Sequence, residues 1–288
     1  MTRRSWLSQR STGPVDVDSD KIDGGMAAVE LSAVDKVFPG GRGRGDVRAL
    51  IGVDLAIAAG DFVTFIGPSG CGKSTLLRLI ADLTGPTAGT VRVNGKSARQ
   101  ARLDQDYGIA FQQAGLMDWR TVARNVELPL ELRGWDRARR RERALELLEL
   151  VGLTDFAGAR PGELSGGMQQ RVAIARALAT GPRLLLMDEP FGALDEMTRE
   201  RLQAELARIA GESDATVVFV THSIPEAVYL SDRVVVMSAR PGRVTTVVDV
   251  GLGERTEDTR EAPEFFAKVT EVREALRGRS TVRTAEER

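Results

Sequence analysis

Apolar and polar residues alternate in two early segments of the chain. The alternation runs over residues 28–38, with Ala33 on the apolar side, and it returns over 53–57. A period of two residues predicts strands with one buried face. The glycine- and arginine-rich stretch 40–45 between them is typical of a hairpin loop, and residues 90–93 predict a further strand that ends in a turn. We therefore expect a small antiparallel sheet.

Further along, short apolar runs alternate with segments that have the 3.6-residue spacing of a helix. Alternating strands and helices of this kind predict a parallel α/β core. A mostly helical section, at about residues 113–165, interrupts the alternation. The predicted strands lie at 62–66, 107–111, 184–187, 216–220, 234–237 and 244–250. The predicted helices lie at 76–80, 136–152, 167–179, 197–209 and 264–277.

The helical section contains one helix whose ends can be read from the sequence. Asp136 can accept hydrogen bonds at its start, Ala144 and Leu148 fall on one face, and Gly152 can end it. Arginines crowd its first turns, and we interpret them as a solvated face, with anionic headgroups or RNA as the alternative partner. They are residues 137, 139, 140, 141 and 143.

Composition narrows the class of protein. Of the 288 residues, 42% are hydrophobic and 28% are charged, which is ordinary for a globular chain. Lys and Arg total 40 against 41 Asp and Glu, so no overall field favours nucleic acid, and no nucleic-acid partner is expected. Cys71 is the only cysteine, which excludes an intramolecular disulfide and a cysteine-based zinc site.

Two features of the chain bear on its ends and on membranes. Residues 1–27 are polar and lack apolar periodicity, so they predict a disordered N-terminal extension. Translation that begins at Met26 is one hypothesis for this extension. Apolar runs stay well short of the roughly 18 residues that a membrane span needs, and the N-terminus lacks the apolar core of a signal peptide.

The stretch from Gly67 to Thr75 matches the phosphate-binding pattern G-x-x-x-x-G-K-[ST]. It lies between a predicted strand and a predicted helix, which is the context that this loop needs. Its glycines let successive backbone amides point at a phosphate chain, and the helix adds its positive N-terminal end. Lys73 should reach the β- and γ-phosphates, and the Ser74 hydroxyl should bind Mg²⁺. The expected nucleotide contacts in this loop are Gly67, Pro68, Ser69, Gly70, Cys71, Gly72, Lys73, Ser74 and Thr75.

A second run of apolar residues, at 184–187, ends in two carboxylates, Asp188 and Glu189. Asp188 can hold Mg²⁺, and Glu189 can orient or deprotonate an attacking water. A buried strand that ends in acids is weak evidence by itself. Together with the phosphate loop it indicates nucleotide hydrolysis.

Residues 164–171, Leu-Ser-Gly-Gly-Met-Gln-Gln-Arg, resemble the signature motif of ATP-binding-cassette (ABC) ATPases, although Ser165 also fits an ordinary helix cap. The family's motifs follow in its order over about residues 29–242. The resemblance implies an α/β P-loop NTPase with a RecA-like core of mainly parallel sheet, an antiparallel β subdomain and an inserted helical subdomain. It assigns residues 28–250 to the ATPase domain, leaves 251–288 as a C-terminal tail with a helix, and implies ATP and Mg²⁺ as cofactors.

The same resemblance assigns roles to single residues. Phe38 matches the aromatic that stacks on adenine, with a place in the core as the alternative, and His222, the only histidine, matches the switch histidine. Gln112 matches the glutamine that follows Mg²⁺ and the γ-phosphate. The implied catalytic residues are Lys73, Gln112, Glu189 and His222, and the implied Mg²⁺ ligands are Ser74, Gln112 and Asp188. The implied nucleotide contacts of the signature motif are Ser165, Gly166, Gly167 and Gln169.

Two subunits of this family pack head to tail, so that the phosphate loop of one faces Ser165 and Gly167 of the other. Residues 193–195 resemble the segment that contacts the opposing subunit. The resemblance thus implies a dimer, and a homodimer is the simplest form.

Segments at 116–122, 128–130, 192–195 and 239–243 resemble the importer subfamily for nitrate, sulfonates and taurine, although Asp82 stands where that subfamily has glycine. The resemblance implies a separate transmembrane permease and, indirectly, an extracytoplasmic solute-binding protein. It also implies a peripheral place on the cytoplasmic side of the cell membrane. Three apolar residues would then lie near the permease groove, with the core of the helical subdomain as their alternative: Leu116, Met117 and Trp119.

Other classes of ABC protein stay open at this point. They are a different importer class, an exporter, and a soluble ABC ATPase that acts on DNA or ribosomes. Soluble members usually carry two cassettes, a long coiled coil or zinc-binding cysteines, and this sequence has none of these. The transported solute does not follow from the chain, because solute specificity resides in the permease and the binding protein.

Overall fold

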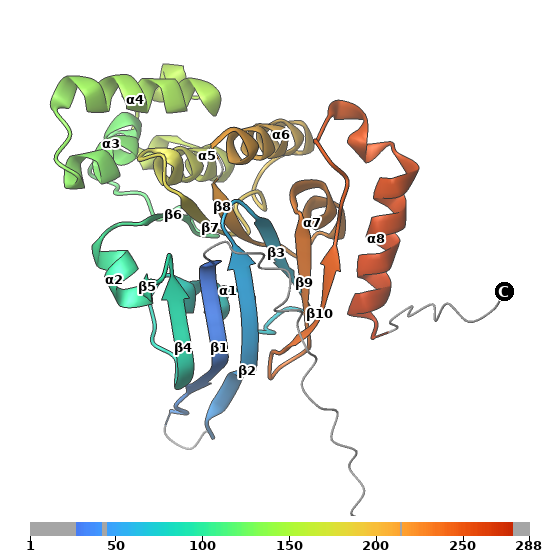
Figure 1. The fold of residues 1–288 in the computed structure, drawn as a ribbon. Helices are drawn as coiled ribbons and strands as arrows, with labels where there is room; N and C mark the ends of the chain where they lie inside the picture. Colours follow the sequence, from blue (N-terminus) through green and yellow to red (C-terminus); the bar gives the residue numbers. More distant parts are fainter. Residues whose placement is uncertain (1–26, 42–44, 214, 279–288) are drawn as a thin grey trace, which may run out of the picture.

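The computed structural model describes residues 27–41, 45–213 and 215–278. Two sheets with helices packed around them make up this part of the chain (Figure 1). Apart from Ala27, the predicted N-terminal extension with Met26 lies outside the described residues. So do positions 42–44 of the predicted hairpin loop and the last ten residues of the predicted tail.

One sheet is antiparallel, as predicted, and its strands follow the order β2-β1-β4-β5. The alternation along β1 is interrupted, however. The pairing with β2 shifts between Leu31 and Val34, and Ala33, at φ 46°, is exposed while Val34 is buried. The prediction that Ala33 lies on the apolar face is therefore wrong, because a bulge moves the next residue inward. The strands are β1 (Ala27–Phe38), β2 (Val47–Ala58), β4 (Ala88–Val93) and β5 (Lys96–Ser97).

The second sheet has six strands in the order β10-β9-β3-β8-β7-β6. Its neighbours pair in parallel except β10, which pairs antiparallel to β9 at one edge. The prediction of a mainly parallel core is confirmed. The strands are β3 (Phe62–Ile66), β6 (Tyr107–Ala110), β7 (Leu184–Asp188), β8 (Thr216–Val220), β9 (Arg233–Met237) and β10 (Val244–Asp249).

Both faces of the six-stranded sheet are covered, because successive side chains of each strand enter different cores. Val63 and Phe65 of β3 pack with α1 (Lys73–Ile80) and the antiparallel sheet, whereas Phe62 and Ile66 pack with the other helices. Helix α1 therefore lies between the two sheets (Figure 1). This position brings the start of α1 to the carboxyl end of the parallel strands.

The remaining helices pack mainly on the other face. Helices α3 and α4 lie farthest from the parallel sheet and pack on each other and on α5 (Figure 1). Two short helices, α2 and α7, were not predicted, since six or seven residues show too few apolar positions to reveal a period. The helices are α2 (Ala98–Leu103), α3 (Val122–Leu132), α4 (Arg137–Leu150), α5 (Gly166–Leu178), α6 (Glu196–Ser213), α7 (Ile224–Leu230) and α8 (Pro263–Leu276). Short 3₁₀ turns are η2 (Thr154–Phe156), η3 (Pro161–Glu163) and η4 (Glu257–Arg260).

Helix α4 shows which features of a helix local sequence patterns predict correctly. The Asp136 carboxylate accepts the backbone N–H of Arg139 at 3.0 Å, as predicted for its cap, and Ala144 and Leu148 are buried. Arg137, Arg139 and Arg141 are exposed, and the guanidinium group of Arg139 stacks on the Trp135 ring, 3.9 Å from the centroid. The exposure of these three residues agrees with the predicted solvated face. Within the described ranges, no helix is both long and apolar enough to span a membrane.

Candidate functional site

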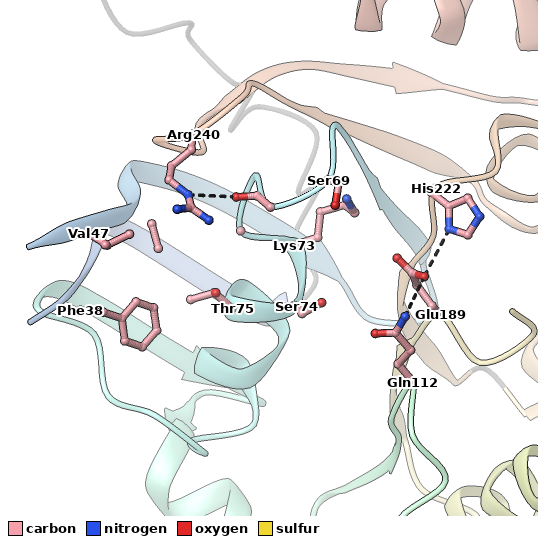
Figure 2. Close-up of a pocket in the computed structure, with 13 residues that line it drawn as sticks. Phe38, Val47, Ser69, Lys73, Ser74, Thr75, Gln112, Glu189, His222 and Arg240 are labelled. Carbon is pink, nitrogen blue, oxygen red and sulfur yellow. Dashed lines mark hydrogen bonds and ion pairs between the residues drawn. The ribbon is translucent and has the colours of Figure 1, made fainter. Parts of the chain in front are cut away.

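Five neighbouring parallel strands end at one hollow of about 490 Å³ (Figure 2). The segments that leave β9, β3, β8, β7 and β6 follow one another along its floor, because parallel strands share one carboxyl edge. The end of the antiparallel β1–β2 pair forms the opposite wall. The lining residues are Phe38, Val47, Ala49, Ser69, Gly70, Gly72, Lys73, Ser74, Thr75, Gln112, Glu189, His222 and Arg240.

The phosphate loop leaves β3 and needs its glycines. Gly72 has φ 105°, and a Cβ there would lie 2.7 Å from the Leu50 side chain. A Cβ on Gly67 would lie 2.8 Å from the Met237 carbonyl oxygen. Gly72 is also the N-cap of α1 and supplies no side chain to bond the first amides. The first turn of α1 therefore keeps its N–H groups for an anion.

Lys73 stands at the centre of this loop. Its side chain is 6% exposed, and Nζ donates to the carbonyl oxygens of Gly67 at 2.8 Å and Pro68 at 3.3 Å. A buried ammonium group beside free helix amides makes a strongly anion-attracting concavity. Gly67, the exposed Pro68 and the fully buried Cys71 do not line the hollow.

Ser74 and Asp188 meet at the end of α1 that faces β7. The Ser74 hydroxyl donates to Asp188 Oδ1 at 2.9 Å, although 114 residues separate them in the sequence. Burial raises the pKa of the Asp188 carboxyl, and the hydrogen bond from Ser74 opposes that rise. A hydroxyl and a carboxylate side by side are the hard oxygen donors that Mg²⁺ prefers.

These two residues fit Mg²⁺ in its usual nucleotide setting. Mg²⁺ keeps several waters and takes only one or two protein ligands when phosphates supply the rest. Within the described part of the chain, no group of three or more His, Cys, Asp and Glu could hold a metal by itself. A bound Mg²⁺ would neutralise charge on the β- and γ-phosphates.

Glu189 lies directly after β7 and has a strained backbone, with φ 47°. Its N–H donates to the Val220 carbonyl oxygen at 2.9 Å, which fixes that conformation. Glu189 Oε2 lies 3.3 Å from Gln112 Nε2 and 3.2 Å from His222 Nδ1 (Figure 2). Two polar side chains from two other strand ends thus converge on one oxygen of Glu189, and backbone strain of this kind is concentrated at functional sites.

The wall formed by β1 and β2 is apolar. Phe38 is 39% exposed and lines the hollow beside Val47 and Ala49. Lys36 Nζ lies 4.9 Å from the centre of the Phe38 ring. The structure therefore excludes the alternative that Phe38 is part of the core. Sequence reasoning did not identify Val47 or Ala49, which have no motif around them.

Arg240 also lines the hollow, but the sequence did not predict it as a site residue. Its Nε donates to the Gly70 carbonyl oxygen at 3.3 Å (Figure 2). The segment after β9 reaches the phosphate loop because Gly242 has no side chain, since a Cβ there would lie 1.9 Å from the Cys71 carbonyl oxygen. Gly242 also exchanges backbone hydrogen bonds with β2, from its N–H to Ala49 O and from Ile51 N–H to its carbonyl oxygen. The segment 239–243 carried only a subfamily resemblance in the sequence.

Comparison with known proteins decides the family. The model of the ABC transporter family matches residues 50–192. The nitrate import ATP-binding protein NrtD of Synechocystis sp. is 44% identical over 263 residues, which cover 89% of this chain and 97% of that protein. The taurine import ATP-binding protein TauB of Rhizobium johnstonii is 46% identical over 245 residues, 83% of this chain and 93% of that protein. The chain belongs to the ABC transporter family.

A solved structure supports the fold of this ABC transporter protein. It is the dimeric post-hydrolysis state of the ATP-binding cassette MJ0796 bound to ADP and Pi. The TM-score is 0.71 at 38% identity, and the match covers 77% of this chain and 98% of that chain. ATP-binding proteins of this family hydrolyse ATP and couple the hydrolysis to transport, so the chain is an ATPase.

The predicted signature residues of this ABC ATPase lie away from the hollow. Ser165 is exposed and caps α5, with its Oγ accepting the N–H of Met168 at 3.2 Å, so the helix-cap interpretation also holds. Gln169 Nε2 donates to the Pro161 carbonyl oxygen at 3.0 Å. Neither they nor Gly166 and Gly167 are among the residues that line the hollow.

Proposed function

We propose that this chain is the ATP-hydrolysing subunit of an importer for nitrate-, sulfonate- or taurine-like solutes, and that it works with a separate permease. The convergence of Gln112 and His222 on Glu189, beside the Lys73 loop, is the observation that carries the ATPase part. The names of NrtD and TauB support the transport part.

The proposed roles follow the position of each residue. The base of ATP stacks on Phe38, and the phosphates bind Lys73 and the backbone amides of the loop residues that line the hollow, which are residues 69, 70 and 72–75. Ser74, Asp188 and Gln112 would hold Mg²⁺. Glu189 accepts a proton from the water that attacks the γ-phosphorus, and His222 holds the Glu189 carboxylate and the γ-phosphate in position.

The exposed signature segment supports a head-to-tail dimer. The α5 N-terminus of a second copy, with Ser165, Gly166, Gly167 and Gln169, faces the γ-phosphate across the hollow. A helix N-terminus there supplies amides and a positive dipole end where negative charge develops. The dimeric state of the MJ0796 cassette supports this arrangement.

The helical subdomain offers an apolar contact for the permease. Trp119 is 73% exposed, whereas Leu116 packs partly against the core. An exposed tryptophan is an effective anchor for a partner helix. We place the chain at the cytoplasmic side of the membrane, where it reaches the extracytoplasmic binding protein only through the permease.

The ATPase part is tested with Glu189→Gln. We expect ATP binding to persist while turnover falls by about 10³-fold, because the variant lacks the group that accepts the proton. ATP binding and phosphate release are measured on the same preparation. Wild-type turnover would contradict the role of Glu189.

The transport part is tested by purifying tagged protein from native membranes, with and without ATP, and identifying bound proteins by mass. Recovery of a protein with many membrane spans supports the importer. Recovery of ribosomal or DNA-repair proteins, with no membrane protein in either condition, would contradict it and leave the ATPase assignment unchanged.

A further inference from the structure

The segment after β10 wraps around α7, the helix that begins two residues after His222. Phe265, Val269 and Val272 of α8 are buried in the same core as Val228 and Leu230 of α7. Helix α7 also packs on β3, so it is clamped between the parallel sheet and α8. The C-terminal segment therefore packs against the helix that follows His222.

Arg255 holds the far end of α7. Its Nε donates to the Tyr229 carbonyl oxygen at 2.7 Å, and its Nη2 donates to the Ser231 carbonyl oxygen at 2.6 Å. Carbonyl groups at a helix C-terminus lack partners within the helix, and a cation is favourable there. The Arg255 side chain is only 9% exposed, so these bonds are shielded from water.

Arg260 begins a buried polar chain that leads back toward His222. Its Nη2 donates to Gln203 Oε1 at 2.6 Å, and Gln203 Nε2 donates to Glu226 Oε1 at 2.7 Å. Gln203 is 2% exposed and Glu226 is 7% exposed. The guanidinium group of Arg260 also stacks on Tyr229, 3.6 Å from the ring centroid.

Glu226 connects this chain to the loop that carries His222. The Glu226 N–H donates to Ser223 Oγ at 3.4 Å, and the Ser223 N–H donates to Thr221 Oγ1 at 3.0 Å. Thr221 and Ser223 are the two neighbours of His222. The orientation of the Gln203 amide is fixed, because its oxygen accepts a hydrogen bond from the Arg260 guanidinium and its nitrogen donates one to the Glu226 carboxylate.

Gln203 lies on α6, which starts directly after the segment that resembles the contact with the opposing subunit. Asp195 Oδ1 accepts the N–H of Thr198 at 3.0 Å and so caps that helix. The polar chain therefore joins three elements: the helix after residues 193–195, the loop of His222 and the C-terminal segment.

We propose that Arg260 and Gln203 are positioning residues for ATP hydrolysis, through which the C-terminal segment sets the place of His222 relative to Glu189. This role rests on the proposed function of His222. Arg260 does not line the nucleotide hollow, so it acts on turnover and leaves ATP binding unchanged.

The test compares steady-state ATP hydrolysis by full-length variants. We expect Arg260→Ala to lower kcat about tenfold with KM changed less than about twofold, because a small displacement of a catalytic group costs rate rather than binding. Arg260→Lys restores most of the rate, since it keeps a cation near Tyr229 and a donor for Gln203. Arg260→Met keeps the packing over Tyr229 and replaces Arg260→Ala in the test if the alanine variant does not fold.

Two controls separate positioning from general stability. Arg208→Ala removes an exposed α6 arginine whose ion pairs among the described residues are with Glu205 and Glu212, so kcat and KM stay unchanged. In a His222→Ala background, Arg260→Ala brings no further loss of residual phosphate release, because it acts through His222.

Three outcomes would overturn the proposal. They are wild-type kcat in both Arg260→Ala and Arg260→Met, a rise in KM without a loss of kcat, and the same proportional loss with and without His222. Wild-type turnover in His222→Ala alone would instead contradict the role proposed for His222, and the positioning role with it, while the Glu189 assignment would still stand on its own test.

Discussion

Two glycine-containing helix N-termini, those of α1 and α5, differ in what surrounds them. The N-cap of α1 is Gly72, which leaves the first amides free beside Lys73 inside the hollow. The N-cap of α5 is Ser165, whose side chain bonds an amide of its own helix on an exposed surface outside the hollow. The first is the proposed anion site within one chain, and the second would serve ATP bound to another chain in the proposed dimer.

The difference shows that the groups around a helix N-terminus, and not the helix dipole alone, decide whether it binds a ligand. At α1 a buried lysine, a hydroxyl and strand-end carboxylates surround the helix end. At α5 the same dipole faces solvent, where water and salt screen it. One chain thus carries the phosphate half of one proposed ATP site and the signature half of another.

The largest effect on turnover is expected from variants that disrupt the phosphate half and the signature half of the proposed ATP site separately. Lys73→Ala removes the buried cation. Ser165→Glu places a negative charge where the γ-phosphate of the other subunit would face it. A negative charge at the N-terminus of α5 does not destabilise the helix itself. We expect each variant alone to lose about 10²-fold in turnover. An equal mixture should regain about a quarter of wild-type turnover, because about half of the dimers then contain one intact site.

Phosphate release before and after mixing measures this recovery. Lys73→Ala should also lose ATP binding, while Ser165→Glu should keep it, and equilibrium nucleotide binding separates the two. Mixtures that stay as inactive as their components would contradict the division of the site between subunits.

A smaller effect is expected in stability from two matched glycine changes. Gly72→Ala forces a Cβ into the left-handed region at φ 105° and to within 2.7 Å of Leu50, so we expect a loss of about 3 kcal/mol. Gly166→Ala meets no atom within 4 Å and lies within a helix, so it should gain up to about 1 kcal/mol. Urea unfolding without nucleotide measures both, and equal losses would contradict the contrast between the two helix ends.

The smallest effect concerns a third helix N-terminus, that of α7. Burial raises the pKa of Glu226 above its usual 4.5, and hydrogen bonds from Thr221 and Gln203 oppose that rise. Above pH 4.5 the Glu226 carboxyl therefore binds more protons in the folded protein than in the unfolded chain. The contribution of Glu226 to the free energy of unfolding falls as pH rises toward the raised pKa.

Glu226→Gln removes this dependence and keeps an acceptor for Gln203. The melting temperature of the variant relative to the wild type should increase as pH rises above 4.5 and then level off. Calorimetry from about pH 4 to about pH 8 measures it. A difference that is the same at every pH would show that burial does not raise the Glu226 pKa.

Sequence patterns predicted the elements whose signals are local. The phosphate loop is a contiguous motif between a strand and a helix, and both of those elements were found as predicted. The face of α8 with Phe265, Val269 and Val272 also follows from helical spacing. Motif order further indicated that Glu189, Gln112 and His222 belong together, and the structure brings them within 3.3 Å.

What could not be predicted depends on contacts between distant segments. Arg240 reaches the phosphate loop only because Gly242 packs against Cys71, and no local pattern records that approach. The bulge at Ala33 depends on pairing with β2. Asp82, which stands where the resembling subfamily has glycine, has φ 49°, a conformation that glycine adopts without strain.

The backbone contacts of Gly242 have a consequence for nucleotide choice. Through them, the strand pair that carries Phe38 and Val47 is fastened to the loop that carries Lys73. These contacts set the separation between the two surfaces. If the base of a nucleotide stacks on Phe38, as proposed, that separation would determine which phosphate of its chain reaches Lys73.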